Sequence, residues 1–163
     1  NQLTKTGKIF SFEPIKENYD IFLENIKINT LENIIPHNLA VTKTEGNIPI
    51  YLNNDESGHS IFEKNTKVVN VESTSLKKIF DVNDIKRCDL LKLDCEGSEY
   101  EIIESLPEEY FKKIDKIIIE YHFAEKYPIL FKNLIKKLES VSFTAKIDRT
   151  DENMGLIFAE KID

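Results

Sequence analysis

The chain has 163 residues, of which 40% are hydrophobic and 31% are charged, and its formal net charge is −7. A chain of this length buries a sizeable core, so we expect a single domain over residues 1–163. The acidic balance argues against nucleic acid as a partner, because phosphate binding needs a basic surface. No apolar run approaches the ~20 residues that cross a bilayer, so no membrane partner is expected.

The cysteines, Cys88 and Cys95, lie at either end of one predicted strand and therefore apart. We expect both to be free thiols in a reducing compartment, which predicts a cytoplasmic protein. The chain begins at Asn1 and its methionine is Met154, so we expect a processed chain or part of a longer protein.

The first elements predict a parallel pair of strands. Residues 8–13 are apolar and β-prone, 14–29 carry apolar side chains at helical spacing, and 34–40 return as a strand that contains Pro36. A strand, a helix and a strand at this spacing form a parallel pair with a right-handed crossover.

The stretch 42–72 behaves differently, with a turn, two strand-like runs and a polar loop between them. This pattern predicts an antiparallel excursion, or flap, outside the parallel core. His59 and Ser60 lie in its loop, within possible reach of a substrate. Residues 74–80 are expected to form a short helix capped by Ser73 or Thr74.

The remainder of the chain alternates strands and helices and ends in a hairpin. In order, we expect a strand at 89–94, a helix at 98–106, a strand at 114–121, a helix at 125–140, and strands at 141–147 and 155–160. The run 114–121 is almost continuously apolar, as in a strand covered on both faces.

The stretch 90–99, LLKLDCEGSE, combines a strand that ends in acid, a turn at Gly97 and the start of a helix. In open α/β sheets the carboxyl ends of strands face the ligand crevice, so Asp94 and Glu96 are expected to project into a site. Alternation places Lys92 on the face of Asp94, one step deeper, where a lysine needs a carboxylate partner. Cys95 points the other way and is expected to be a buried packing thiol.

A second strand also stops on an acid, in the stretch 8–14, KIFSFEP. Glu13 at this position can accept two hydrogen bonds from a ribose diol, as in nucleotide-binding folds. Alternatively it is an exposed acid favoured by the dipole at the start of the next helix.

Together these features resemble the FkbM-type methyltransferases, which use S-adenosyl-L-methionine (SAM). The residues that carry the resemblance are Phe12-Glu13-Pro14, Asn18, Asn25, Asn29, Ala40-Val41, Ser75-Leu76, the run Leu91 to Glu99, and Ile119-Glu120-Tyr121-His122. The resemblance spans roughly residues 8 to 122, and its specific part is Asp-x-Glu-Gly-x-Glu. It implies a Rossmann-like α/β sheet, mostly parallel and closed by a C-terminal antiparallel hairpin, with SAM as cofactor.

The resemblance also implies roles for the cofactor-binding residues. It favours Glu13 as the ribose acceptor and places Asp94 beside the cofactor. Asn38 and Ala40 would border the adenine ring, although a turn-forming role for Asn38 is equally open.

The catalytic residues expected from this pattern are Asp94, Glu96, Glu120, His122 and Lys92. Glu120 and His122 are two apart and share a strand face, so they meet Asp94 if their strands are neighbours. Either Asp94 or His122 would take the proton of an attacking alcohol. Glu99 is expected on the solvent face of its helix. The acidic residues and His122 offer ligands for a divalent metal, but they form no specific metal motif and no metal site is predicted.

In this family a first strand lies at the centre of the sheet and leads into a glycine-rich cofactor loop. Neither has a counterpart here, because no two of the five glycines form a Gly-x-Gly arrangement. Strands 8–13 and 89–94 would then each expose an apolar edge, which is an aggregation hazard. We therefore expect an upstream segment or a second chain to complete the sheet.

The function expected from these observations is SAM-dependent O-methylation of a hydroxyl on a sugar or another small natural product. Two other interpretations remain open. One is a non-catalytic module that retains the fold for interactions, and the other is a metal-dependent hydrolase that uses the acid cluster.

Overall fold

The computed structural model describes residues 7–52 and 67–162, so His59 and Ser60 of the predicted flap lie outside the described residues. The elements alternate between strands and helices, as predicted. They are β1 (Ile9–Phe12), α1 (Lys16–Ile28), β2 (Ile34–His37), β3 (Ala40–Thr42), β4 (Gly46–Leu52), β5 (Lys67–Ser75), α2 (Leu76–Val82), β6 (Leu91–Asp94), α3 (Glu99–Ser105), α4 (Glu108–Phe111), β7 (Lys116–Tyr121), α5 (Pro128–Ser140), β8 (Phe143–Arg149) and β9 (Gly155–Lys161).

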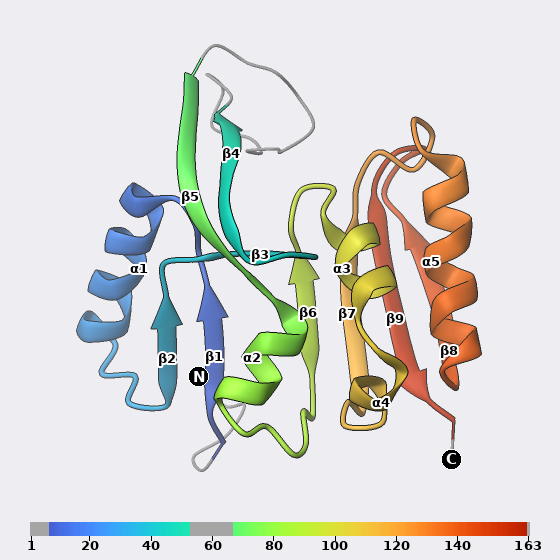
Figure 1. The fold of residues 1–163 in the computed structure, drawn as a ribbon, viewed down its shortest axis with the longest axis horizontal. Helices are drawn as coiled ribbons and strands as arrows, with labels where there is room; N and C mark the ends of the chain where they lie inside the picture. The colour runs from blue at the N-terminus through green and yellow to red at the C-terminus, as the bar shows by residue number, and fades with distance from the viewer. Residues whose placement is uncertain (1–6, 53–66, 163) are drawn as a thin grey trace.

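The first two strands form the parallel pair that the sequence predicts, with Ile9 opposite Ile34. Helix α1 connects them and begins at Lys16, after Ile15 in an extended conformation, and not at Pro14. The predicted strand 34–40 is in fact two strands, because β2 ends at His37 and β3 begins at Ala40 in a different sheet. Figure 1 shows α1 beside β2 at one end of the molecule.

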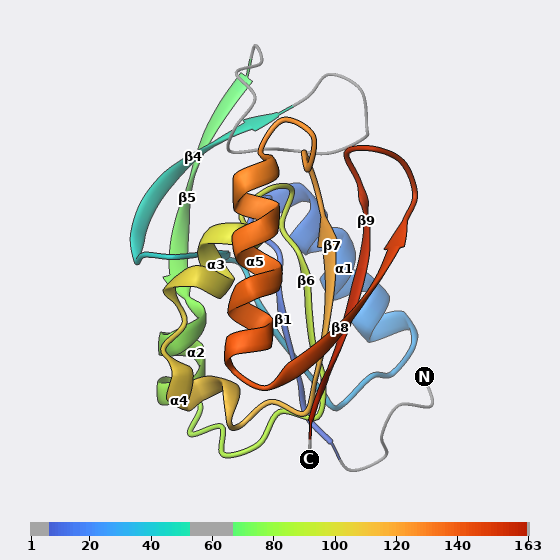
Figure 2. The same ribbon diagram turned by 90° about the vertical axis from the view of Figure 1, so that its right-hand side faces the viewer.

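The second sheet has the order β3-β5-β4 and contains the predicted antiparallel excursion. Strands β4 and β5 pair antiparallel from Gly46 opposite Ser73 to Leu52 opposite Lys67. They extend beyond the helices at the end towards which β1 and β6 point (Figures 1 and 2). Helix α2 follows β5 directly, and its cap is Ser75, which accepts a hydrogen bond from the Lys78 N–H at 3.2 Å, in place of the predicted Ser73 or Thr74.

The third sheet has the order β6-β7-β9-β8. Strands β6 and β7 are parallel neighbours, as the site prediction requires, and Asp94 lies opposite Glu120 in their register. The C-terminal strands form the predicted antiparallel hairpin, and β9 is the strand that pairs with β7. Figure 2 shows α5 lying against this sheet.

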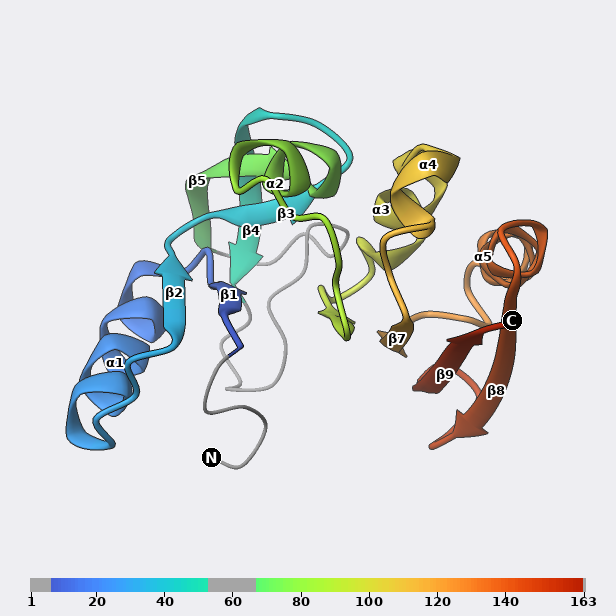
Figure 3. The same ribbon diagram turned by 90° about the horizontal axis from the view of Figure 1, so that it is seen from below.

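The main core lies between this sheet and the helices that follow its strands. Figure 3, seen from below, shows α3, α4 and α5 on one side of β7, β8 and β9. The side chains of Ile117, Ile119 and Tyr121 point into this core and are buried, whereas those of Ile118 and Glu120 alternate with them and are half-buried. The prediction that this strand is covered on both faces is therefore wrong. Its continuous apolar run does not reveal that α3, α4 and α5 all pack on the same side of the strand.

Strands β1 and β6 point the same way and come next to each other in the views of Figures 1 and 3. They do not pair, since β1 belongs to the two-stranded sheet and β6 is the end strand of the four-stranded sheet. Within the described residues each has one open edge. The prediction that a further strand completes the sheet stays a prediction. No helix in the described part of the chain is long and apolar enough to span a bilayer.

Candidate functional site

The turn between β6 and α3 carries the acidic residues of the predicted site. Glu96 has a φ of 50° and Gly97 a φ of 105°, so two successive residues adopt positive φ values. Glycine accepts this conformation readily, whereas a glutamate there is strained. The turn reverses the chain within three residues and places Asp94 and Glu96 together at the carboxyl end of β6.

Lys92 and Asp94 form the predicted ion pair on one face of β6, with Nζ 3.2 Å from Oδ2. The pair is not buried, however, because the side chains are 58% and 38% exposed. This face lies opposite the helical layer, so the expectation of a lysine beneath the site in an apolar environment is wrong. A pair this exposed contributes little to stability, at most about 1 kcal/mol.

Glu99 differs most from its prediction, because its side chain is fully buried and does not lie on the solvent face of α3. Its Oε1 accepts a hydrogen bond from the Cys95 N–H at 2.9 Å and lies 3.0 Å from Nδ1 of His122. The sequence contains a signal for this position, since Glu99 precedes the buried Ile102 and Ile103 by three and four residues. It therefore lies on the apolar face of its helix.

His122 is held from two sides just after the end of β7. Its Nδ1 faces Glu99, and its backbone carbonyl accepts a hydrogen bond from the Tyr100 hydroxyl at 2.5 Å. Its Nε2 lies 3.6 Å from Oε2 of Glu96. Burial alone lowers the pKa of His122, but the hydrogen bond and charge of Glu99, followed by the charges of Glu96 and Asp94, outweigh it, and the pKa is raised.

Asp94, Glu120 and His122 converge as the sequence predicts. One ligand atom from each, a carboxylate oxygen or an imidazole nitrogen, lies within 4.8 Å of the others. Glu96 adjoins this group, and burial raises the pKa of its carboxyl, with the His122 imidazole opposing the rise. Carboxylates that share a small volume with an imidazole can accept a proton and can attract a cation.

The predicted cofactor residues Glu13 and Asn38 lie together at the end of β1. Oε1 of Glu13 accepts a hydrogen bond from the Ile15 N–H at 2.7 Å, in the manner of an acid at a helix start. Nδ2 of Asn38 donates to the carbonyls of Glu13 and Pro14 at 2.8 and 2.9 Å, so this amide fixes the loop. Their roles towards ribose and adenine stay predictions.

Ala40, the third residue predicted at the adenine ring, is 5% exposed. It packs in a small second core with Ile15, Ile50 and Val71, beneath the surface of the loop. Any contact with a cofactor would have to be made by its backbone, and the predicted role stays untested.

The cysteines are free thiols, as predicted. Burial raises the pKa of Cys95 to about 12 and that of Cys88 to about 11. Cys95 packs against the main core, as expected for a thiol that points away from Asp94. Both groups are protonated at neutral pH, which excludes them as thiolate nucleophiles there.

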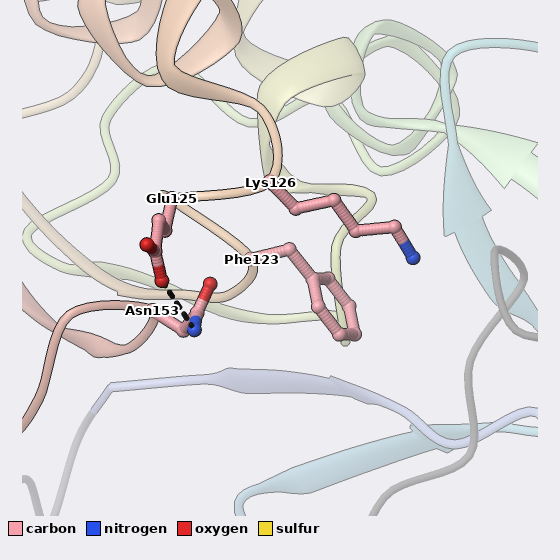
Figure 4. A pocket seen from close by; sticks show the side chains of 4 residues that line it. All are labelled: Phe123, Glu125, Lys126 and Asn153. Carbon is pink, nitrogen blue, oxygen red and sulfur yellow. Dashed lines mark hydrogen bonds between the residues drawn. The ribbon is translucent and has the colours of Figure 1, made fainter.

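A hollow of about 590 Å³ begins immediately after His122 and is lined by Phe123, Glu125, Lys126 and Asn153. Figure 4 shows the aromatic ring of Phe123 and the side chain of Lys126 beside each other, and the contact between Asn153 and Glu125. Phe123 has a φ of 58°, a strained conformation that turns the chain away from β7. The residue types that line this hollow are common in loops, so the sequence alone does not specify what would bind there.

A protein that resembles this chain in three dimensions is SMU.1697c from Streptococcus mutans, solved as a candidate methyltransferase in complex with SAH. The superposition covers 95% of this chain and 76% of that chain, with a TM-score of 0.51 and 10% sequence identity. At this identity the likeness shows the fold. It confirms the predicted Rossmann-like α/β architecture of a SAM methyltransferase.

Two fungal proteins are similar in sequence. Methyltransferase 1 of Beauveria bassiana (strain ARSEF 2860) is 26% identical over 165 residues, covering 88% of this chain and 65% of the relative. Methyltransferase sdnD of Sordaria araneosa is 23% identical over 147 residues, covering 70% of this chain and 57% of the relative. The chain thus spans less than two thirds of the length of these relatives.

Residues 1–147 match the family model described as the methyltransferase FkbM domain. The chain belongs to the FkbM methyltransferase family.

Proposed function

We propose that this domain transfers a methyl group from SAM to a hydroxyl of a sugar or another small natural product. The observation that carries the proposal is the group formed by Asp94, Glu120 and His122 at the carboxyl ends of the parallel strands β6 and β7. In open α/β sheets this edge is where ligands bind.

In the proposed reaction, the acceptor oxygen forms a bond to the methyl carbon while the bond from that carbon to the sulfonium sulfur breaks. The electron pair of the broken bond stays on sulfur, which becomes a neutral thioether, and the alcohol proton passes to a carboxylate or imidazole of the site. The protein contributes mainly by aligning the oxygen with the methyl group. The acidic surroundings favour the positively charged cofactor before transfer.

The cofactor would extend from Asp94 towards the end of β1. Glu13 has one carboxylate oxygen committed to the Ile15 N–H, and a carboxylate can accept further hydrogen bonds on its second oxygen. The ribose hydroxyls are the proposed donors. The proposal is supported by the fold shared with SMU.1697c, which was solved with SAH.

The acceptor would lie in the hollow next to His122. The hollow is open to solvent, and Phe123 offers an aromatic surface against which a sugar ring or apolar ring system can stack. Phe123 directly follows His122 in the chain, so a molecule that stacks on Phe123 would lie near the candidate site.

The test has two stages, both with the purified protein. Calorimetry with SAH asks whether the cofactor product binds, and mass spectrometry after incubation with SAM and a panel of glycosides and phenols asks whether an acceptor gains a methyl group. SAH binding together with a methylated product supports the proposal. Failure to bind SAH would instead favour a non-catalytic interaction module. Product formation that is independent of SAM and stopped by a chelator would favour the hydrolase interpretation.

A further inference from the structure

We propose that Asp94, Glu120 and His122 form the binding site of a divalent cation that holds the acceptor hydroxyl. The three protein ligands are inferred from the structure alone. Only the identity of the further ligand, the acceptor hydroxyl, rests on the proposed function. Each residue supplies one ligand atom, and these atoms lie within 4.8 Å of one another. Two of the three residues, Asp94 and Glu120, are brought together by the register of β6 and β7, which places them opposite each other.

The orientation of His122 is the first support. Its Nδ1 lies 3.0 Å from Oε1 of the buried Glu99, so Nδ1 carries the hydrogen of that contact, and in the neutral imidazole Nε2 then has a lone pair. Nε2 is also 3.6 Å from Oε2 of Glu96, which is too long for a direct hydrogen bond. A carboxylate that fixes the distal nitrogen of a histidine is the usual outer partner of a metal-binding imidazole.

The second support is independent of the distances among the three ligands. Glu99 is fully buried, and its Oε2 has no hydrogen-bond partner among the described residues. A buried carboxylate is costly unless positive charge compensates it. The group that it contacts is His122, so the buried charge is compensated either by a proton on the imidazole or by a cation bound at its Nε2.

The surrounding charges favour a cation as well. Asp94, Glu96 and Glu120 all lie at this end of the sheet, and the ammonium nearest to Asp94 belongs to Lys92, on a side chain that is 58% exposed. Lys92 contacts only one oxygen of Asp94, which leaves the other for coordination. Because water screens the Lys92 ammonium at this exposure, it offsets only part of the negative charge of the three carboxylates.

The ligand set also indicates which ions fit. Bonds of about 2.1 Å separate neighbouring ligands of an octahedral ion by about 3 Å, so the present spacing must contract by up to about 2 Å. The 38% exposed side chain of Asp94 and the half-buried Glu120 have room to move, whereas His122 is fixed. Two carboxylates and one imidazole suit Mn²⁺, Mg²⁺ or Fe²⁺, and they leave open positions for water or substrate.

Open positions beside the acceptor hollow give the ion a role in choosing the substrate. A hydroxyl bound to a divalent cation loses its proton more readily, and two neighbouring hydroxyls of a sugar can chelate the ion. The proposal therefore favours acceptors with a vicinal diol over those with one isolated hydroxyl.

Mn²⁺ is the probe for the test, because its unpaired electrons report both its stoichiometry and its ligands. Titration of the metal-free protein in the absence of SAM and acceptor, followed by electron paramagnetic resonance, should show one bound Mn²⁺ per chain. Spin-echo modulation should show one coordinated nitrogen. Asp94→Asn and Glu120→Gln should each weaken binding roughly tenfold or more, and His122→Gln should remove the nitrogen signal.

Glu101→Gln is the matched control, since Glu101 lies on α3, forms a surface pair with Lys43 and is not one of the three ligands. It should bind Mn²⁺ as the unmodified protein does. Circular dichroism and thermal unfolding establish that each variant is folded, and the exposed Asp94 makes Asp94→Asn the variant least apt to disturb the core. Absence of Mn²⁺ binding, or binding that persists unchanged in both Asp94→Asn and Glu120→Gln, overturns the proposal. Because the assay uses no SAM, a failure of the methyltransferase proposal would not affect this result.

Discussion

Oε1 of Glu99, at the first position of α3, lies 3.0 Å from Nδ1 of His122, just beyond the end of β7. Both side chains are buried, and the same oxygen also accepts the Cys95 N–H at 2.9 Å. The strand-turn-helix unit and the neighbouring strand are therefore joined by a charged contact behind the candidate site. This contact fixes the imidazole ring and leaves Nε2 directed at the acidic group.

Glu99→Gln should separate the charge of this contact from its shape. The amide oxygen can still accept the Cys95 N–H, so we expect the thermal unfolding temperature to change little. Without the negative charge the imidazole is held less firmly, and we expect turnover to fall by about 10- to 100-fold, as for other outer partners of site histidines. Steady-state kinetics together with SAH calorimetry provide the measurement.

In that experiment the affinity for SAH should remain within about threefold of the original, because Glu99 lies behind His122 and away from Glu13. The surface variant Glu101→Gln is the control and should keep both parameters. If Glu99→Gln retained full turnover, the contact would be structural only.

Asp94→Asn should abolish methyl transfer and leave the fold intact. Its side chain is partly exposed and its pair with Lys92 is worth little, so we expect a loss of stability of no more than about 1 kcal/mol. Activity is compared with that of Asp89→Asn, which changes an acid that is 82% exposed and precedes the same strand. Unimpaired turnover in Asp94→Asn would remove this residue from the mechanism.

Glu13→Gln tests the cofactor end of the site. A hydrogen bond between a charged carboxylate and a ribose hydroxyl contributes about 1.5–3 kcal/mol, so we expect the Kd for SAH to rise by about 10- to 100-fold. Glu17→Gln is the control, because Glu17 is exposed in the first turn of α1 and outside the proposed site. Calorimetry measures both, and equal affinities for the two variants would count against ribose binding by Glu13.

The raised pKa of Cys95 leads to a prediction about its reactivity. With a pKa of about 12, the thiol is protonated at pH 8, and its thiolate fraction is more than about 100-fold below that of an ordinary cysteine. Iodoacetamide should thus modify Cys95 in the folded protein far more slowly than in 6 M guanidinium, as followed by peptide mass spectrometry. The rate in the folded protein should increase with pH above 8. Rapid modification at pH 7 would show that the thiol is not buried as described.

Gly155→Ala tests the junction between the hairpin and β7. An added Cβ would lie 2.4 Å from the Asp148 carbonyl oxygen, which is backbone, and 2.6 Å from the hydroxyl of Tyr121, whose side chain is held by burial. We expect a loss of about 1–3 kcal/mol in the free energy of unfolding, measured by urea denaturation. Thr144→Ala, at an exposed position of β8, should change stability by less than about 1 kcal/mol. Equal stabilities would show that the hairpin can shift to admit a methyl group.

Much of the candidate site could be predicted from the sequence, because the relevant patterns are local. The apolar run that ends at Asp94, the glycine turn and the following helix specify one unit, and the alternation in Glu120 and His122 places both on one face. The parallel neighbours β6 and β7 then bring these groups together. Their convergence needed no information beyond strand order.

The wrong predictions concern the burial of side chains, which depends on which elements cover each face of a strand or helix. The apolar strand β7 was expected to be covered on both sides, and Lys92 to be deep, but α3, α4 and α5 lie on the opposite face of this sheet. Glu99 was assigned to solvent because charged residues usually are. Its spacing to Ile102 and Ile103 outweighs that tendency, since the whole face of the helix turns inward.

The open edges of β1 and β6 have a consequence for backbone protection. In a parallel strand, alternate N–H groups point to opposite sides, so the amides of β6 that face away from β7 have no strand partner among the described residues. Deuterium should therefore enter every second amide of β6 quickly while the intervening positions remain protected. A ligand or a peptide segment that fills this edge would reveal itself by slowing that alternate set alone.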